Sequence, residues 1–440
     1  MENDHHGTFC INNSGRRHIN QKEVTIYKFI IILFVSIICS TYAGAYSVLT
    51  HEAIIDVEWD KVIVPLLLQK YPGATEAQLK DAHAYAYGGA VMPDMGYYPF
   101  GSQFFTDLIH YVRSGDFVSN LLNEANDINE YAFALGAMSH YFSDKYGHPI
   151  GTNHCVPIVY TKDKKKFGSV VTYEQDPLSH KRMEFGFDIL QTASGNYASE
   201  KYHEFIGFQF SRPVLERAFL KTYGLEISDL FNDLPKAISS FRWITKDLFP
   251  VMTRAAWASK KNDIVKANPG MTKKKFEYKM RKANYYHEYG RKLNKPGVFP
   301  GVLGWIVKVM PKVGPLKTFK VIMPGPEAEK IFIQSFDTVL VHYSAELKSL
   351  SAKKYKMANI DFDTGNETVP GEYSLADNAY AQLLLTLNGG KFNKVSSSLQ
   401  QNILNFYSGC NEKGAALEGA ETWDHIDKAL DSLKIYHSVN

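Results

Sequence analysis

The sequence predicts a mainly α-helical protein: a compact multi-helix domain followed by a helical C-terminal extension. Three observations support this. Apolar residues recur at helical spacing through "AFLKTYGLEISDLFNDLPKAISSFRWITKDLFPVMTRAAWAS" (218–259). Histidines and carboxylates recur four residues apart, which places them on one helix face. The chain of 440 residues is 45% hydrophobic and 13% aromatic, enough to bury a substantial core.

The amino terminus carries an export pattern. Lys22 and Lys28 precede the apolar run "FIIILFVSIICS" (29–40), and "AGA" (43–45) supplies the small residues at which signal peptidase cleaves. We expect residues 1–45 to be a signal peptide, so that the mature, exported chain starts at Tyr46. An uncleaved membrane anchor is the alternative, although the run is short for a full span. Cys155 and Cys410 would remain after cleavage, so disulfides do not define the fold.

The stretch "DINEYAFALGAMSHYFSDKYGHP" (127–149) predicts a helix that holds possible metal ligands. Asp127 and Glu130 form a capping-box pattern, and Gly147 with Pro149 indicates the helix end. His140 and Asp144 share a face and can approach one atom. They lie off the apolar stripe, which is formed by Tyr131, Ala134, Leu135, Met138 and Phe142. Small residues upstream of them, such as Gly136, leave room for an ion or a closely packed backbone. An ordinary His–Asp surface pair is the alternative reading.

Further ligand-type residues occur on both sides of this helix. Asp94 lies in a loop rich in Pro and Gly, and His110 lies on a short helix that follows. In "DPLSHKRMEFGFDIL" (176–190), His180 and Glu184 are again four apart, after a helix start at Asp176 and Pro177. In chain order the set is His51, Asp94, His110, His140, Asp144, His148, His180 and Glu184.

With "HYFSD" (140–144) and "HKRME" (180–184), this ordered set resembles the zinc-dependent phospholipase C family over roughly residues 46–260. The related single-strand-specific zinc nucleases and the catalytic domain of glycosylphosphatidylinositol-specific phospholipase D share the pattern. The resemblance implies an exported zinc-dependent phosphodiesterase. Its reaction would be phospholipase C hydrolysis of the head-group phosphodiester of glycerophospholipids by a metal-activated water.

The resemblance also implies roles for the ligands, with two or three Zn²⁺ ions. One zinc would be held by Asp94, His110, His140 and Asp144, and a second by His148, His180 and Glu184. A third would be held by His51 and by the amine and carbonyl of Tyr46, with Asp144 as a bridge. Asp94 would also be the catalytic residue, acting as general base. Glu174, Asp107 and Asp188 are candidates for orienting the imidazoles.

Three features depart from the bacterial phospholipase pattern. The mature chain would begin with Tyr46, where the family usually has Trp. His148 follows Asp144 by four residues instead of six, a spacing shared with the phospholipase D domain, and His154 is the alternative ligand. His51 lies sixth from the new terminus, as in the zinc nucleases, which usually close the set with H-x-x-x-D. Glu184 therefore favours the lipases.

The remaining residues, 261–440, are predicted to form the C-terminal extension after a catalytic domain at 46–260. Residues 259–324 are rich in basic and aromatic side chains; they could contact an anionic membrane surface, or form a solvated face packed on the first domain. Residues 327–440 indicate a few helices and a turn-rich interruption, "DFDTGNETVPGEYS" (361–374), with no assigned function.

Two other functions remain open. A single-strand nuclease or 3'-nucleotidase of the same fold would bind nucleic acid, although the net charge of +3 is too small to favour that partner. A non-catalytic surface-binding protein could keep the metal fold as a scaffold. The substrate of the preferred function is a phospholipid or another phosphodiester.

Overall fold

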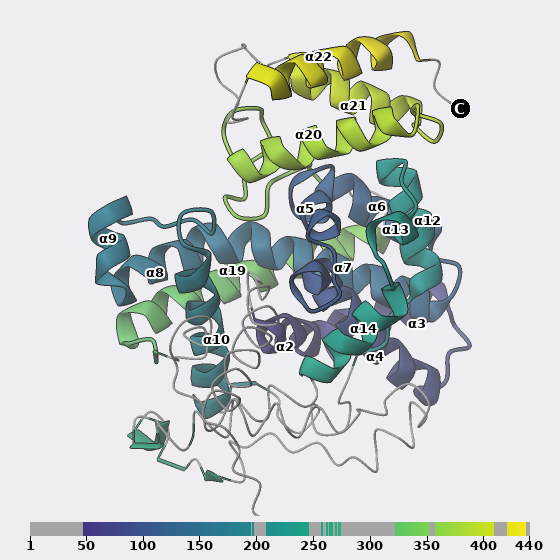
Figure 1. The fold of residues 1–440 in the computed structure, drawn as a ribbon. Helices are drawn as coiled ribbons and strands as arrows, with labels where there is room; N and C mark the ends of the chain where they lie inside the picture. Colours follow the sequence, from purple (N-terminus) through teal and green to yellow (C-terminus); the bar gives the residue numbers. More distant parts are fainter. Residues whose placement is uncertain are drawn as a thin grey trace, which may run out of the picture.

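A computed structural model describes residues 47–194, 196–197, 208–245, 257, 261–262, 264–266, 269–270, 272–273, 322–351, 357–408 and 420–436. The prediction of a mainly α-helical, compact protein is confirmed (Figure 1). Within these residues no strand forms, and a β-bridge joins Ile360 to Glu367. The predicted signal peptide, Tyr46 and most of 259–324 lie outside the described residues. Among the described helices, none is long and apolar enough to cross a membrane.

The described part of the region up to residue 245 is a series of helices. They are α2 (Val48–Glu58), the π-helical η1 (Trp59–Ile63), α3 (Val64–Lys70), α4 (Glu76–Val91), the 3₁₀ helix η2 (Met92–Tyr97), α5 (Gln103–Tyr111), α6 (Ser114–Glu124), α7 (Ile128–Tyr146), the π-helical η3 (Gly147–Thr152), α8 (Asn153–Val159), α9 (Thr161–Phe167), α10 (Pro177–Ser194), α12 (Arg212–Tyr223), α13 (Ile227–Leu230) and α14 (Leu234–Trp243).

Helix α7 is the centre of the fold and is buried along its length from Ile128 to Asp144. The sequence predicted one apolar stripe, but neighbouring helices cover every face. A β-carbon added at Gly136 would lie 2.0 Å from the carbonyl oxygen of Ala86, and one at Gly89 would lie 1.9 Å from that of Phe133. The small residues therefore serve the close approach of α4 and α7 and leave no space at that point of the helix.

The two ends of α7 differ from the sequence prediction in detail. Asp127 caps the helix by accepting from the amides of Asn129 and Glu130, as expected. The side chain of Glu130 accepts from the amide of Asn126 instead of that of Asp127. At the other end the chain does not stop at Gly147. It continues through the π-helical turn η3 into α8, a type of turn that is frequent at functional sites.

The C-terminal helices pack on this framework. They are α19 (Pro326–Ser351), α20 (Ser374–Gly389), α21 (Ser397–Ser408) and α22 (Ala420–Ile435). Helix α19 lies against α7, η3 and α8, and the Tyr343 hydroxyl donates to the carbonyl of Leu135 (3.0 Å). Helices α20 to α22 form a layer beside α5, at the top of Figure 1. Residues from both regions contribute to one hydrophobic core.

Candidate metal centre

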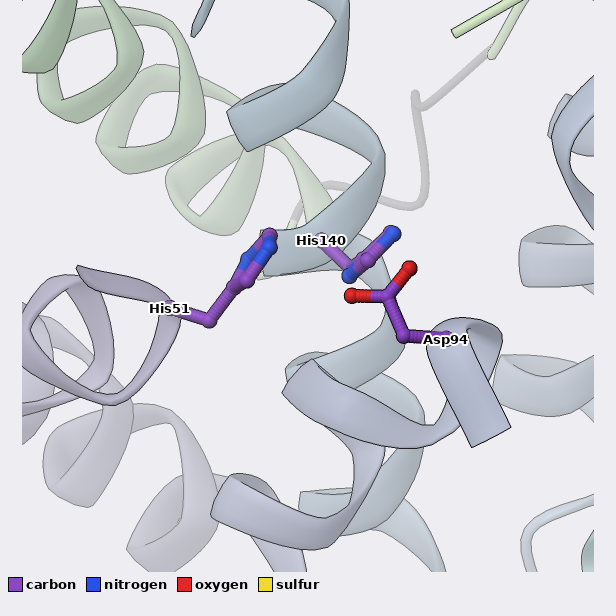
Figure 2. Close-up of side chains that lie close together, drawn as sticks. All are labelled: His51, Asp94 and His140. Atoms are coloured by element: carbon purple, nitrogen blue, oxygen red, sulfur yellow. The ribbon is translucent and has the colours of Figure 1, made fainter. Parts of the chain in front are cut away.

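The eight predicted ligand residues between His51 and Glu184 converge on the interior of the helical framework. Each is at most 3% exposed. Their ligand atoms fall into three groups: His51 with Asp94 and His140; His110 with His140 and Asp144; His148 with His180 and Glu184. Figure 2 shows the first group, in which the side chains of three separate segments point toward one another.

The first two groups share His140 and form one centre, which we call the first centre. Nε2 of His140 lies 2.9 Å from Oδ2 of Asp144, and Nε2 of His110 lies 3.7 Å from the same oxygen. Oδ1 of Asp144 faces Nε2 of His51 at 3.8 Å. Asp94 joins through Oδ1, which lies 3.4 Å from Nε2 of His110. Asp144 thus has one oxygen toward His51 and the other toward His110 and His140, as a bridging ligand requires.

The remaining group, His148 with His180 and Glu184, is separate from these, and we call it the second centre. Nε2 of His148 lies 3.8 Å from Oε1 of Glu184, and Nδ1 of His180 lies 3.6 Å from it. His180 and Glu184 are one turn apart on α10, while His148 comes from η3. His154, the alternative to His148, lies on α8, is exposed and belongs to none of the three groups.

Backbone carbonyls orient three of the imidazoles. Nδ1 of His110 bonds the carbonyl of Thr106 (2.9 Å), Nδ1 of His140 that of Ala90 (2.8 Å), and Nε2 of His180 that of Val171 (2.6 Å). Because a carbonyl oxygen only accepts, each of these nitrogens carries a proton. In the neutral ring, the other nitrogen then presents a lone pair toward its carboxylates, which is the tautomer that a metal needs.

The inward-facing atoms fit a cation. Within the described residues they are buried and make no hydrogen bond: Nε2 of His110 and His140, Nδ1 of His180, Oδ1 of Asp94, both carboxylate oxygens of Asp144 and Oε1 of Glu184. Buried polar atoms are normally satisfied, and lone pairs that face one another need a positive charge between them. Imidazole nitrogen and carboxylate oxygen are ligands that suit Zn²⁺.

The electrostatics of these residues also favour a bound cation. Burial raises the pKa of Glu184 well above its usual value, and the carboxylates of Asp94 and Asp144 raise it further. Burial lowers the pKa of His180 to about 4 and, with His140 nearby, that of His51 well below 6.5, so both rings stay neutral at pH 7. Burial would lower the pKa of His140 as well, but Asp144 raises it to about 9. A zinc ion held by Nε2 of His140 would take the place of the proton there.

Asp94 is held more rigidly than the sequence indicated. The predicted loop is the 3₁₀ helix η2, and all its residues are buried. The Thr106 hydroxyl donates to the carbonyl of Pro93 (2.7 Å) and accepts from the amide of Gly96 (2.9 Å). These bonds tie η2 to α5, which carries His110. Burial raises the pKa of Asp94, and the neighbouring His110 opposes this shift.

The predicted orienting carboxylates bond groups other than the ligand imidazoles. Asp188 accepts from the amides of Leu49 and Thr50, both at 3.0 Å, and so anchors the start of α2, which carries His51. Asp107 accepts from Gln103, and Glu174 from Ser374. Outside the predicted ligand set, Asp363 approaches a ligand imidazole: its Oδ1 lies 3.1 Å from Nδ1 of His148. Its turn-rich segment was visible in the sequence, but no spacing linked it to His148.

Comparison with known proteins agrees with this geometry. Residues 50–233 match the family described as zinc dependent phospholipase C. The match contains every described ligand of both centres, from His51 to Glu184. No curated protein and no solved structure matches the chain significantly. The family consists of phosphodiesterases of the phospholipase C type, and it implies a phospholipid substrate and zinc. The predicted resemblance is thus confirmed: residues 50–233 of the chain match the zinc-dependent phospholipase C family.

Proposed function

We propose that the protein is an exported phospholipase C that hydrolyses the head-group phosphodiester of glycerophospholipids. The observation that carries the proposal is the convergence of two buried centres with ligand atoms aimed at shared points, inside the region that matches the family. Adjacent zinc ions would supply Lewis acids for phosphoryl oxygens and lower the pKa of a water toward ~7. We assign two or three ions to the site.

The chain's own residues have distinct tasks in this proposal. The helices orient the imidazoles, and Asp144 places its two oxygens on opposite sides of the first centre. Asp94 is the general base, because its buried carboxylate has a raised pKa and faces the same centre. A base of raised pKa holds a proton more readily during the reaction.

The test is metal content and hydrolysis measured on one preparation. Protein that starts at Tyr46 should contain two or three zinc ions by mass spectrometry and release a phosphorylated head group from phosphatidylcholine. Single-stranded DNA is assayed beside it. Cleavage of DNA without lipid hydrolysis would instead establish the nuclease function. Bound zinc without either activity would identify a non-catalytic protein.

Export is part of the proposal through the amino terminus. Cleavage after Ala45 would free the amine of Tyr46 close to the start of α2, five residues before His51 in the chain. An amine of pKa ~8 needs modest help from Zn²⁺ to deprotonate and become a ligand. A variant with two extra residues before Tyr46 should hold one zinc fewer and hydrolyse lipid more slowly. Equal zinc content and equal rates in the two proteins would refute the terminal-amine ligand.

A further inference from the structure

The turn-rich segment 357–373 lies against the metal centres, although it is far from the family region in sequence. Its carboxylate Asp363 is 2% exposed. Oδ1 lies 3.1 Å from Nδ1 of His148, on the side of the ring away from Glu184. The ring of Phe362 packs against His110, with centroids 5.1 Å apart, and against His140, at 5.8 Å. The segment therefore covers one face of the site.

The segment has a defined shape. Gly365 adopts a positive φ of 73°, and a β-carbon there would lie 2.5 Å from the carbonyl oxygen of Lys145. Asp361 accepts from the amide of Thr364 (2.7 Å) and its own amide donates to the carbonyl of Asn366 (2.9 Å). These bonds close a tight turn that places Asp363 beside the site.

Hydrogen bonds also tie the segment to the family region. The amide of Phe362 donates to the carbonyl of His110 (3.1 Å), and the Asn153 side chain donates to the carbonyl of Asp363 (2.9 Å). The hydroxyl of Ser114 donates to the carbonyl of Ile360 (2.8 Å) and accepts from the amide of the same residue (3.0 Å). The backbone position of Asp363 is thus fixed relative to the helices that carry the ligands.

The second oxygen of Asp363 is already engaged. Oδ2 accepts from the hydroxyl of Tyr111 (2.9 Å) and from that of Tyr373. Two phenol donors leave Oδ1 directed at His148 and keep the carboxylate in place. Asp363 is absent from the three ligand groups. Asp363 therefore lies where it can orient the ligand residue His148.

We propose that Asp363 is a positioning residue that completes the second centre from the C-terminal region. It accepts a hydrogen bond from Nδ1–H of His148, fixes the tautomer and directs Nε2 toward His180 and Glu184. Carboxylate partners of this kind hold ligand imidazoles in orientation and raise their basicity. The inference rests on the proposed zinc chemistry of the site but does not depend on which phosphodiester is the substrate.

The experiment measures zinc affinity on the full chain by chelator competition, and cobalt absorption as a report of ligand geometry. Asp363→Ala should weaken zinc at the second centre by about 10–100-fold and change the cobalt spectrum. Asp363→Asn, whose amide oxygen still accepts from His148, should fall between the native protein and the alanine variant. Zinc at the first centre should stay within about two-fold of native in both.

Glu367→Gln is the matched control, because it also removes the charge of a carboxylate in this segment, but at an exposed position. It should keep both zinc affinities near native. If Asp363→Ala does not fold, the measurements on Asp363→Asn test the proposal. Native zinc affinity and an unchanged cobalt spectrum in Asp363→Asn, or equal losses in Glu367→Gln, would overturn the proposal. Failure of the native protein to hydrolyse lipid, with zinc bound as expected, would reject the phospholipase function and leave the role of Asp363 standing.

Discussion

The two centres are built in different ways. In the first centre, the rings of His110 and His140 are oriented by backbone carbonyls of α5 and α4. In the second, His180 bonds a backbone carbonyl, but His148 faces Asp363 from a segment of the C-terminal region. The first centre depends on how closely a few helices of the family region pack. The second also depends on a contact between regions distant in sequence.

This difference predicts which substitutions should weaken zinc binding at each centre. A backbone carbonyl cannot be removed by substitution, so the first centre should respond to ligand changes and to helix spacing. A side-chain partner can be removed singly, so the second should respond to changes outside its ligands. The following predictions are ordered from the largest expected effect to the smallest.

Asp144→Asn should have the largest effect, because this residue faces three histidines of the first centre. Loss of the charge leaves His140 buried without its partner and removes a bridging ligand. We expect a loss of about 3–5 kcal/mol in unfolding free energy, together with loss of zinc from the first centre. Denaturant unfolding and zinc content measure the two effects. Asp337→Asn, on an exposed position of α19, is the control. Unchanged zinc content in Asp144→Asn would refute its ligand role.

His148→Ala should remove the zinc of the second centre and leave the first occupied, since Nε2 of His148 points at His180 and Glu184. His154→Ala is the natural control, because that residue is exposed and lies six residues further along the chain. It should keep full zinc content. Zinc content measured by mass spectrometry distinguishes the two variants. Loss of zinc in His154→Ala, with full zinc content in His148→Ala, would assign the ligand role to His154.

Gly136→Ala tests the helix spacing beneath the first centre. The added carbon would lie 2.0 Å from the carbonyl of Ala86, so α4 and α7 must move apart. Overpacking of this kind costs about 1–3 kcal/mol. Zinc affinity should fall at the first centre more than at the second. Gly389→Ala, where a β-carbon meets nothing within 4 Å, is the control and should unfold at native denaturant concentration or slightly above it. An equal loss at both centres would contradict their separate construction.

Thr106→Val should have the smallest effect. It keeps the shape of the side chain but removes the bonds to Pro93 and Gly96 that hold η2, and with it Asp94. We expect about 1 kcal/mol of destabilisation and a few-fold loss of zinc affinity at the first centre. Thr338→Val, whose hydroxyl bonds the carbonyl of Gln334 within α19, is the comparison. Native zinc affinity in Thr106→Val would show that η2 holds Asp94 in place without the two hydrogen bonds of Thr106.

Much of the fold and of the ligand set could be predicted from the sequence, because the relevant patterns are local. Helical periodicity indicated the class. A four-residue spacing places His140 with Asp144, and His180 with Glu184, on one face of a helix whatever the rest of the chain does. The cap at Asp127 and the start of α10 at Asp176 follow from neighbouring residues in the same way.

The other features of the fold and of the site depend on packing between segments that are distant in the sequence. No local pattern distinguished α7 as buried on every side, because that depends on which helices surround it. The η2 helix at Asp94 and the π turn at His148 replaced a loop and a helix end, since tertiary bonds and Pro149 set their backbone. Asp363 could not be connected to His148 in advance, because only the folded chain brings the 357–373 segment against η3. The sequence by itself determined which residues offer ligand atoms, and the tertiary structure decided how those atoms are grouped and oriented.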